Sequence, residues 1–214
     1  MDGKSIGTPE SYTYKNLTLN SRIVATFTGA MLFLDVRRED WFYSDVRDVV
    51  EHGLFHGTTQ DLFSPNAPMT RGMLVTVLYR LAGSPKSAAD SGFADVAADK
   101  YYADAVSWAA ENGIVSGVSD GCFAPDSRVT REQLAAILYR YARDKRYDTG
   151  KTADLTGFAD YGQISSYAAE ALSWANAEGL VSGRRKRRFL RRGRPRARRL
   201  RQFCTGLRKM LQNN

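Results

Sequence analysis

Residues 93–142 read "FADVAADKYYADAVSWAAENGIVSGVSDGCFAPDSRVTREQLAAILYRYA", and this stretch decides the fold because the chain repeats it. Residues 33–82 read "FLDVRREDWFYSDVRDVVEHGLFHGTTQDLFSPNAPMTRGMLVTVLYRLA" and align with it at an offset of 60, without a gap. A third copy begins at Phe158 with "FADYGQISSYAAEALSWANAEGLVSG". One extra residue near Ser165 raises its offset from the second copy to 66. Repetition of this kind is typical of a chain built from one structural unit.

Each copy predicts two helices around a loop. In the second copy we expect the first helix at about residues 102–112, with Gly113 as the residue that ends it. A loop rich in Gly, Ser, Asp and Pro follows. The second helix begins at Thr130, because "TREQ" is a capping box in which Thr130 and Gln133 satisfy each other's backbone N–H groups. Its buried stripe is predicted to comprise Leu134, Ile137, Leu138 and Tyr141.

A unit of two helices cannot bury such a stripe alone, so the copies should pack on one another. The predicted fold is mainly α, with three helix–loop–helix repeats in a pseudo-threefold bundle. The predicted repeats span residues 32–84, 92–145 and 157–183, of which the third is incomplete. Trp108 and Trp174, inside the first helices, should be core residues.

The composition is ordinary for a globular protein, with 43% hydrophobic and 25% charged residues in 214. The net charge of +8 comes from residues 184–214, which hold 14 of the 31 Lys and Arg and no acidic residue. Residues 1–183 carry a net charge of −6. The basic character therefore belongs to the tail. No stretch approaches the roughly 20 apolar residues of a membrane span.

Five short motifs recur in the same order in the first two copies. They are "F-x-D-V", an aromatic pair before the first helix, "E-x-G-[LI]-[FV]-x-G", "F-x-P" and "T-R". Together they resemble the S-layer homology family over residues 33–183. The resemblance implies non-covalent attachment of a bacterial surface protein to cell-wall polysaccharide, which in many members bears ketal-linked pyruvate. It implies an extracellular location at the cell wall, and ligand grooves between neighbouring repeats.

A pyruvylated sugar presents a carboxylate, and an Arg in the first turn of a helix offers paired donors beside the positive helix end. Arg71 and Arg131 have that place, after the caps Thr70 and Thr130. The first copy reads "TRGM" where "TRAE" is usual in the family. The groove of the first repeat therefore lacks the acidic side chain of that motif. The other residues predicted to bind polysaccharide are Glu132, Trp41, Tyr101, Tyr102, Gly57, Gly117 and Asp120.

Structural roles compete with these binding roles. Trp41, Tyr101 and Tyr102 can supply flat faces for sugar rings, but we favour core or half-buried positions for them. The two glycines, Gly57 and Gly117, can bring backbone N–H groups close to a ligand or simply stop helices. Arg131 can pair with a carboxylate of the neighbouring repeat instead of a ligand.

No catalytic residues, metal ligands or cofactor site are predicted. His52 and His56 stand four apart, but the first helix should end between them and no third ligand is evident. The chain shows no nucleophile–His–acid set, so we expect no enzyme activity. Two alternative functions stay open. One is binding of nucleic acid or another polyanion through the basic tail, for which the repeats give no reason. The other is a targeting fragment of a cell-wall hydrolase.

Both ends of the chain differ from the repeats. Residues 11–29 alternate apolar and polar side chains and predict a short β-hairpin. Residues 1–31 resemble the end of the immunoglobulin-like or β-repeat domains of bacterial surface proteins, and they lack the apolar core of a signal peptide, so we expect a fragment of a longer protein. In another reading frame residues 202–214 can encode "ILHRLAENVAEQ", with "ILHR" in register with "ILYR". We interpret residues 184–214 as a frameshifted, disordered ending of the third repeat.

Overall fold

The computed structural model describes residues 33–87, 90–119 and 121–182. All of them belong to the second of two units into which the chain divides, Met31–Asn214. They are mainly helical, as predicted. The predicted N-terminal hairpin and the basic tail lie outside the described residues.

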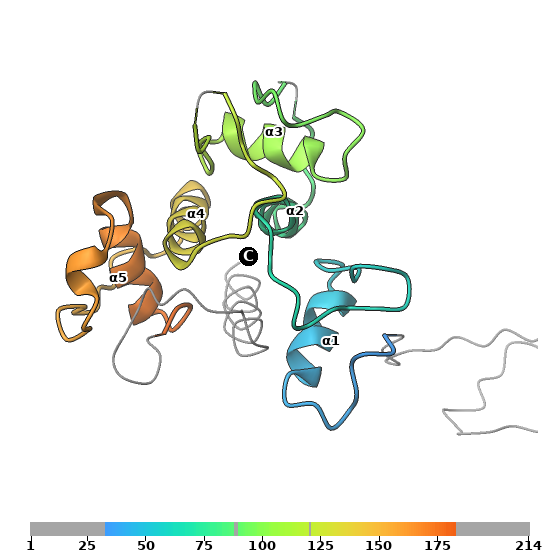
Figure 1. Ribbon diagram of the computed structural model, residues 1–214, viewed down its shortest axis with the longest axis horizontal. Helices are drawn as coiled ribbons and strands as arrows, with labels where there is room; N and C mark the ends of the chain where they lie inside the picture. Colours follow the sequence, from blue (N-terminus) through green and yellow to red (C-terminus); the bar gives the residue numbers. More distant parts are fainter. Residues whose placement is uncertain (1–32, 88–89, 120, 183–214) are drawn as a thin grey trace, which may run out of the picture. The chain divides into compact units, whose positions relative to one another are not determined.

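Each repeat begins with a helix of nine residues (Figure 1): α1 (Tyr43–Glu51), α3 (Ala103–Glu111) and α5 (Ala169–Ala177). The first two repeats continue with a second helix, α2 (Arg71–Leu81) and α4 (Arg131–Asp144). Two short 3₁₀ turns, η1 (Tyr161–Gln163) and η2 (Ser166–Ala168), precede α5. The predicted bounds of α3 are therefore correct to within one residue at each end.

Local sequence explains where these helices begin and end. Thr130 and Gln133 form the predicted capping box at the start of α4. Thr70 caps α2 through the Met73 N–H, but Met73 cannot reach back as Gln133 does. The residues that follow the first helices are glycines in the left-handed conformation, with φ of 66°, 65° and 73° at Gly53, Gly113 and Gly179.

A carboxylate holds the loop of each of the first two repeats. Asp95 accepts hydrogen bonds from the backbone N–H groups of Phe123 and Ala124, at 2.8 and 2.6 Å. Asp35 makes the equivalent bonds in the first repeat, to Phe63 and Ser64. Charged acceptors form stronger hydrogen bonds than neutral ones. The Asp of "F-x-D-V" therefore fixes the "F-x-P" loop 28 residues further on.

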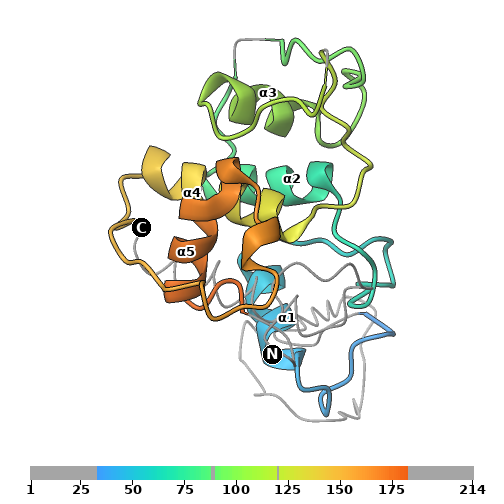
Figure 2. The ribbon, with the colours of Figure 1, turned by 60° about the vertical axis from the view of Figure 1, so that its left-hand side comes forward.

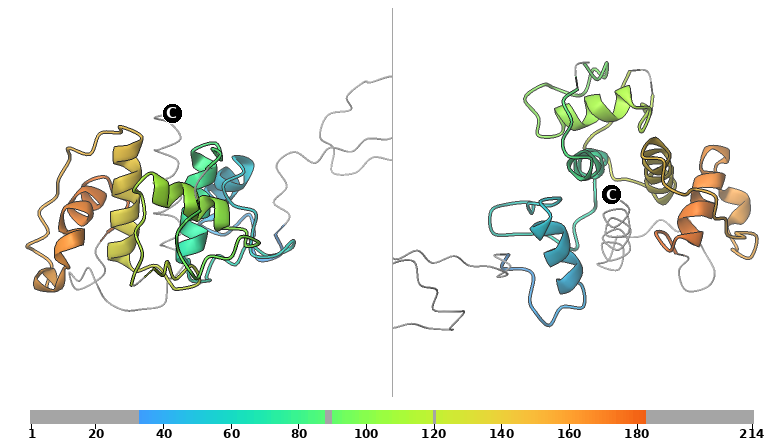
Figure 3. Two further views of the ribbon diagram at one scale, coloured as in Figure 1. Left: turned by 90° about the horizontal axis from the view of Figure 1, so that it is seen from above. Right: turned by 180° about the vertical axis from the view of Figure 1, so that it is seen from behind.

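The second helix of a repeat packs on the first helix of the next one. Helix α2 lies beside α3 (Figure 2), and α4 lies beside α5 (Figure 3). The rings of Tyr79 and Trp108 meet at 5.6 Å in the first of these contacts. Tyr139 and Trp174 meet at 5.4 Å at the equivalent place in the second. Trp108 and Trp174 are buried, as predicted. The apolar faces of α2 and α4 are buried between repeats. The pseudo-threefold arrangement stays a prediction.

Candidate functional site

The polar residues predicted to bind ligand gather where one repeat meets the next. We define the 1–2 junction as the start of α2, from Thr70 to Gly72, with its contacts in the second repeat. The 2–3 junction is the start of α4, from Thr130 to Glu132, with its contacts in the third. At the 1–2 junction the N–H groups of Arg71 and Gly72 donate to loop carbonyls of the second repeat, at 3.0 and 2.8 Å. The loop thus satisfies donors that a helix start leaves without an intrahelical partner.

Arg71 is a buried side chain, with only 4% of its surface exposed. Its Nε donates to the Phe123 carbonyl at 2.8 Å, and its Nη2 donates to the Ser116 carbonyl at 3.1 Å. The guanidinium also lies 4.5 Å from the centre of the Phe123 ring. Burial lowers the pKa of Arg71, and the nearby Tyr167 and Asp95 partly offset this effect. Arg71 therefore joins two repeats and has little surface left for a ligand.

Arg131 makes the matching contact at the 2–3 junction but is only partly buried. Its Nη1 donates to the Ser182 carbonyl at 2.6 Å, and Ser182 corresponds to Ser116 at the offset of 66. Glu132, beside it, accepts a hydrogen bond from the Ser165 N–H at 2.7 Å. Both arginines of the "T-R" pairs thus donate to a carbonyl of the following repeat.

The three repeats place an exposed aromatic residue at the same position. Trp41, Tyr101 and Tyr167 are 47%, 62% and 54% exposed. The core or half-buried position that we favoured from the sequence is correct for Tyr102, which is 5% exposed, whereas Trp41 and Tyr101 are not core residues and keep much of their surface in solvent. The physical reason is that neighbouring residues at a helix start point in different directions, so the second residue of each pair fills the core.

Tyr167 is a surface residue that the sequence analysis missed. The extra residue near Ser165 hides the match, but the offset of 66 pairs Tyr167 with Tyr101. Burial raises the pKa of Tyr167 and the Glu132 carboxylate raises it further, whereas the Thr130 hydroxyl and the charges of Arg140 and Arg71 lower it. Tyr101 lies beside the cap Thr70 in the same way.

Internal packing accounts for the two predicted glycines. A Cβ on Gly57 would lie 2.5 Å from the Phe33 ring, and a Cβ on Gly117 would lie 2.7 Å from the Cys122 carbonyl. Both distances are shorter than real contacts allow. Close approach of a ligand to their backbone stays a prediction, and Asp120 lies outside the described residues.

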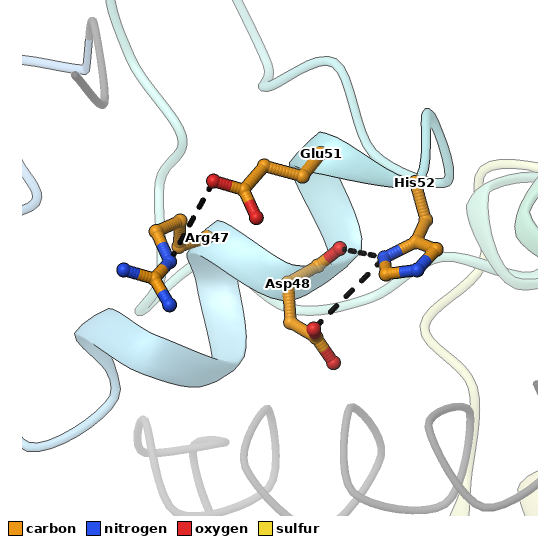
Figure 4. A network of polar contacts seen from close by, with 4 residues as sticks. All are labelled: Arg47, Asp48, Glu51 and His52. Carbon is orange, nitrogen blue, oxygen red and sulfur yellow. Dashed lines mark hydrogen bonds and ion pairs between the residues drawn. The ribbon is translucent and has the colours of Figure 1, made fainter. Parts of the chain in front are cut away.

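Another polar network lies on α1 (Figure 4). Arg47 pairs with Glu51 at 3.6 Å, and the His52 Nδ1 lies 2.7 Å from the Asp48 carbonyl and 3.9 Å from its carboxylate. Half of the side-chain surface of three of these residues is exposed, so such pairs contribute little energy. His52 ends α1 rather than forming a ligand cluster with His56.

Across the described ranges no group of three or more His, Cys, Asp or Glu side chains is placed to hold a metal ion. None of the helices in those ranges has the length and apolar character needed to cross a membrane.

The model of the S-layer homology domain matches residues 32–72, 92–135 and 157–190, more than half of the chain. Each segment begins at the first residue of a predicted repeat, and the first two segments end within α2 and α4. The match supports a surface-anchoring module.

Curated relatives share the same region. A surface-layer 125 kDa protein of Lysinibacillus sphaericus is 32% identical over 138 residues, which is 64% of this chain and 11% of that protein. An endoglucanase of Bacillus sp. (strain KSM-635) is 30% identical over 73% of this chain and 16% of its own length. A cellulosome-anchoring protein of Acetivibrio thermocellus is 28% identical over 42% of this chain and 22% of its own length. The chain spans less than a quarter of the length of these relatives.

Proposed function

Because the chain belongs to the S-layer homology domain family, we propose that it anchors a larger surface protein non-covalently to cell-wall polysaccharide. Two of the relatives carry surface-layer or cellulosome-anchoring roles in their names, which supports this function. The endoglucanase matches over only 16% of its length. That limited overlap supports a binding role for this chain without catalysis of its own.

The observation that carries the proposal is the exposed aromatic residue in every repeat. Trp41, Tyr101 and Tyr167 are separated widely in sequence but have the same place at the start of a first helix. Flat aromatic faces bind the apolar faces of sugar rings while their polar edge stays in water. Three such faces on one chain fit a polymer of repeated sugars, because several weak contacts combine on a multivalent ligand.

The ligand we propose is a wall polymer that bears ketal-linked pyruvate. Arg131 and Thr130 lie at the start of α4, where the helix dipole and the guanidinium favour an anion. Glu132, next to them, would accept hydrogen bonds from sugar hydroxyl groups. Arg71 and Tyr102 are buried, so their part in binding is to hold the second repeat in place.

The test is co-sedimentation of the chain with purified bacterial cell walls. The combined variant Trp41→Ala, Tyr101→Ala and Tyr167→Ala should lose at least tenfold in affinity. Tyr161→Ala is the matched control, because Tyr161 is 48% exposed but lies outside the aromatic position. Equal loss in both variants, or no binding by the unaltered chain, contradicts the proposal.

Arg131→Ala should weaken binding by about 1–3 kcal/mol on walls that keep their pyruvyl groups. Removal of the pyruvyl groups from the walls should abolish the difference in affinity between Arg131→Ala and wild type.

Polyanion binding is the second candidate, since residues 184–214 carry 14 basic residues. Binding by a tail of this kind would fall steeply with salt and would compete with DNA. Wall binding that DNA does not displace at physiological salt would favour the repeats over the tail.

A further inference from the structure

Helix α1 differs from the other two first helices in what packs on it. Helix α3 receives α2, and α5 receives α4, each from the preceding repeat. None of the other helices that the structure describes packs on α1 to a comparable extent. The surface of α1 that corresponds to these contacts therefore indicates what kind of segment it can accept.

That surface is acidic on α1, whereas it is apolar on α3 and α5. The equivalent residues that receive the preceding helix are buried, and they are Ala105 and Trp108 in α3 and Ala171 and Trp174 in α5. Helix α1 carries Asp45 and Asp48 at these two positions, and both are half-buried. An apolar helix placed there would bury carboxylates without compensation, so the surface suits a basic segment.

The C-terminal tail keeps the register of a second helix. At the offset of 66, four apolar residues of the tail correspond to the buried stripe of α4. These residues are Leu200, Phe203, Cys204 and Leu207, which match Leu134, Ile137, Leu138 and Tyr141. They recur at the spacing of an amphipathic helix. The tail residues lie outside the described ranges, and the match is in sequence.

A second set of tail positions changes in the opposite sense to α1. Tyr139 of α4 contacts α5, and it shares its face of the helix with the buried residues Ala135 and Ala142. The corresponding residues of the tail are Arg201, Thr205 and Arg208. Small apolar residues are thus replaced by arginines on the tail, and by aspartates on α1. Opposite charges at matched positions stabilise a contact that two apolar faces stabilise elsewhere.

The third repeat also shows a sign of continuing into the tail. Asp160 is 6% exposed, and it corresponds to Asp35 and Asp95, which accept hydrogen bonds from backbone N–H groups of their loops. A buried carboxylate requires such donors. The equivalent positions in the third repeat are residues 189 and 190, with a phenylalanine at 189 as in the first two repeats. The match to the family likewise extends to residue 190.

We propose that residues 197–211, the closing segment, pack on α1 of the same molecule and pair Arg201 and Arg208 with Asp45 and Asp48. Its apolar residues then face the same way as the buried stripe of α4. The intervening residues 183–196 are as long as residues 117–130, which lead to α4 in the second repeat. The basic charge of the tail thus completes the module, independently of the ligand that the module binds.

Hydrogen exchange of the full chain, followed by mass spectrometry, provides the test. In wild type, peptides from residues 197–211 should exchange at least about tenfold more slowly than the same sequence as a free peptide. Asp45→Lys combined with Asp48→Lys should remove this protection, because lysines repel Arg201 and Arg208. Adding Arg201→Glu and Arg208→Glu, which gives the swap variant, should restore it, because the charges are then exchanged between the two sides.

The control is Glu39→Lys combined with Asp61→Lys, which changes the net charge equally at two exposed positions of the same repeat. It should leave the protection unchanged. Peptides from α3 report whether each variant is folded. If the lysines on α1 also expose α3, the swap variant decides: restored protection supports the proposal, and its absence overturns it.

Two further outcomes would overturn the proposal. In the first, the closing segment of wild type exchanges as fast as the free peptide, or its protection survives the two lysines on α1. In the second, the protection depends on protein concentration and light scattering shows a dimer. The segment that packs on α1 would then come from a second copy of the chain.

Discussion

Gly72 is a single position at which one repeat is adapted to the next. It lies in the first turn of α2. A Cβ added to Gly72 would lie 2.9 Å from the Tyr102 ring and 3.3 Å from the Pro125 carbonyl oxygen. A glycine inside a helix costs about 1 kcal/mol relative to alanine, so the glycine needs a physical reason. The buried Tyr102 ring supplies it, because even one methyl group would overlap that ring. At the equivalent position α4 carries Glu132, and the residue of the third repeat that corresponds to Tyr102 is Ala168.

We predict that Gly72→Ala changes the free energy of unfolding in opposite directions in wild type and in the Tyr102→Ala background. In wild type Gly72→Ala should lower the free energy of unfolding, because overpacking costs about 1–3 kcal/mol. In the Tyr102→Ala background the same substitution should raise it by up to about 1 kcal/mol, since Ala is the better helix former. Urea unfolding followed by circular dichroism gives both values. The same sign in both backgrounds would show that the Tyr102 ring is not the cause.

In each of the first two repeats, an aspartate fixes the loop between the two helices by accepting hydrogen bonds from its backbone. Asp95 accepts two backbone N–H groups of the loop between α3 and α4, and it lies near Arg71. Burial alone raises the pKa of Asp95, but the hydrogen bonds from Phe123 and Ala124, with the charge of Arg71, lower it overall. The ionised carboxylate is thus the form that the folded loop prefers.

A pH dependence follows for this loop. Because the pKa of Asp95 is lower in the folded chain, its contribution to stability is complete above the unfolded value of about 3.9. That contribution is lost as the pH falls through the folded value. Asp95→Asn should therefore be less stable than wild type at pH 7, and the difference should shrink as the pH falls below about 3.9. Urea unfolding at pH 7, 5, 4 and 3 provides the test; a constant difference at every pH contradicts it.

At the scale of the whole molecule, the second helix of each of the first two repeats packs on the repeat that follows it. Helices α2 and α4 bury their stripes against α3 and α5 of the following repeats. Arg71 strengthens the first of these contacts through the buried Phe123, 52 residues away in sequence. Contacts between distant segments make the repeats depend on one another for stability.

Arg71→Met tests this dependence. The substitution keeps an unbranched apolar side chain but leaves the Phe123 carbonyl without its guanidinium donor. It should lower the free energy of unfolding by about 1–3 kcal/mol. The control is Arg38→Met, an exposed arginine, which should change stability by less than about 0.5 kcal/mol. Equal effects of the two substitutions in urea unfolding would rule out a special role for Arg71.

The sequence by itself determined the repeats, the helix ends and the family. Caps such as Thr130 and terminating glycines such as Gly113 act within one or two turns, so their signals are local and readable. The tertiary structure alone decided that Arg71 is buried while Arg131 is partly exposed, and that Tyr101 faces water while Tyr102 fills the core. It also decided that Arg80 donates to the Leu54 carbonyl within its own repeat. The physical reason is that burial and hydrogen bonding at the junctions depend on loops and helices of the following repeat, which no local pattern in the first repeat encodes.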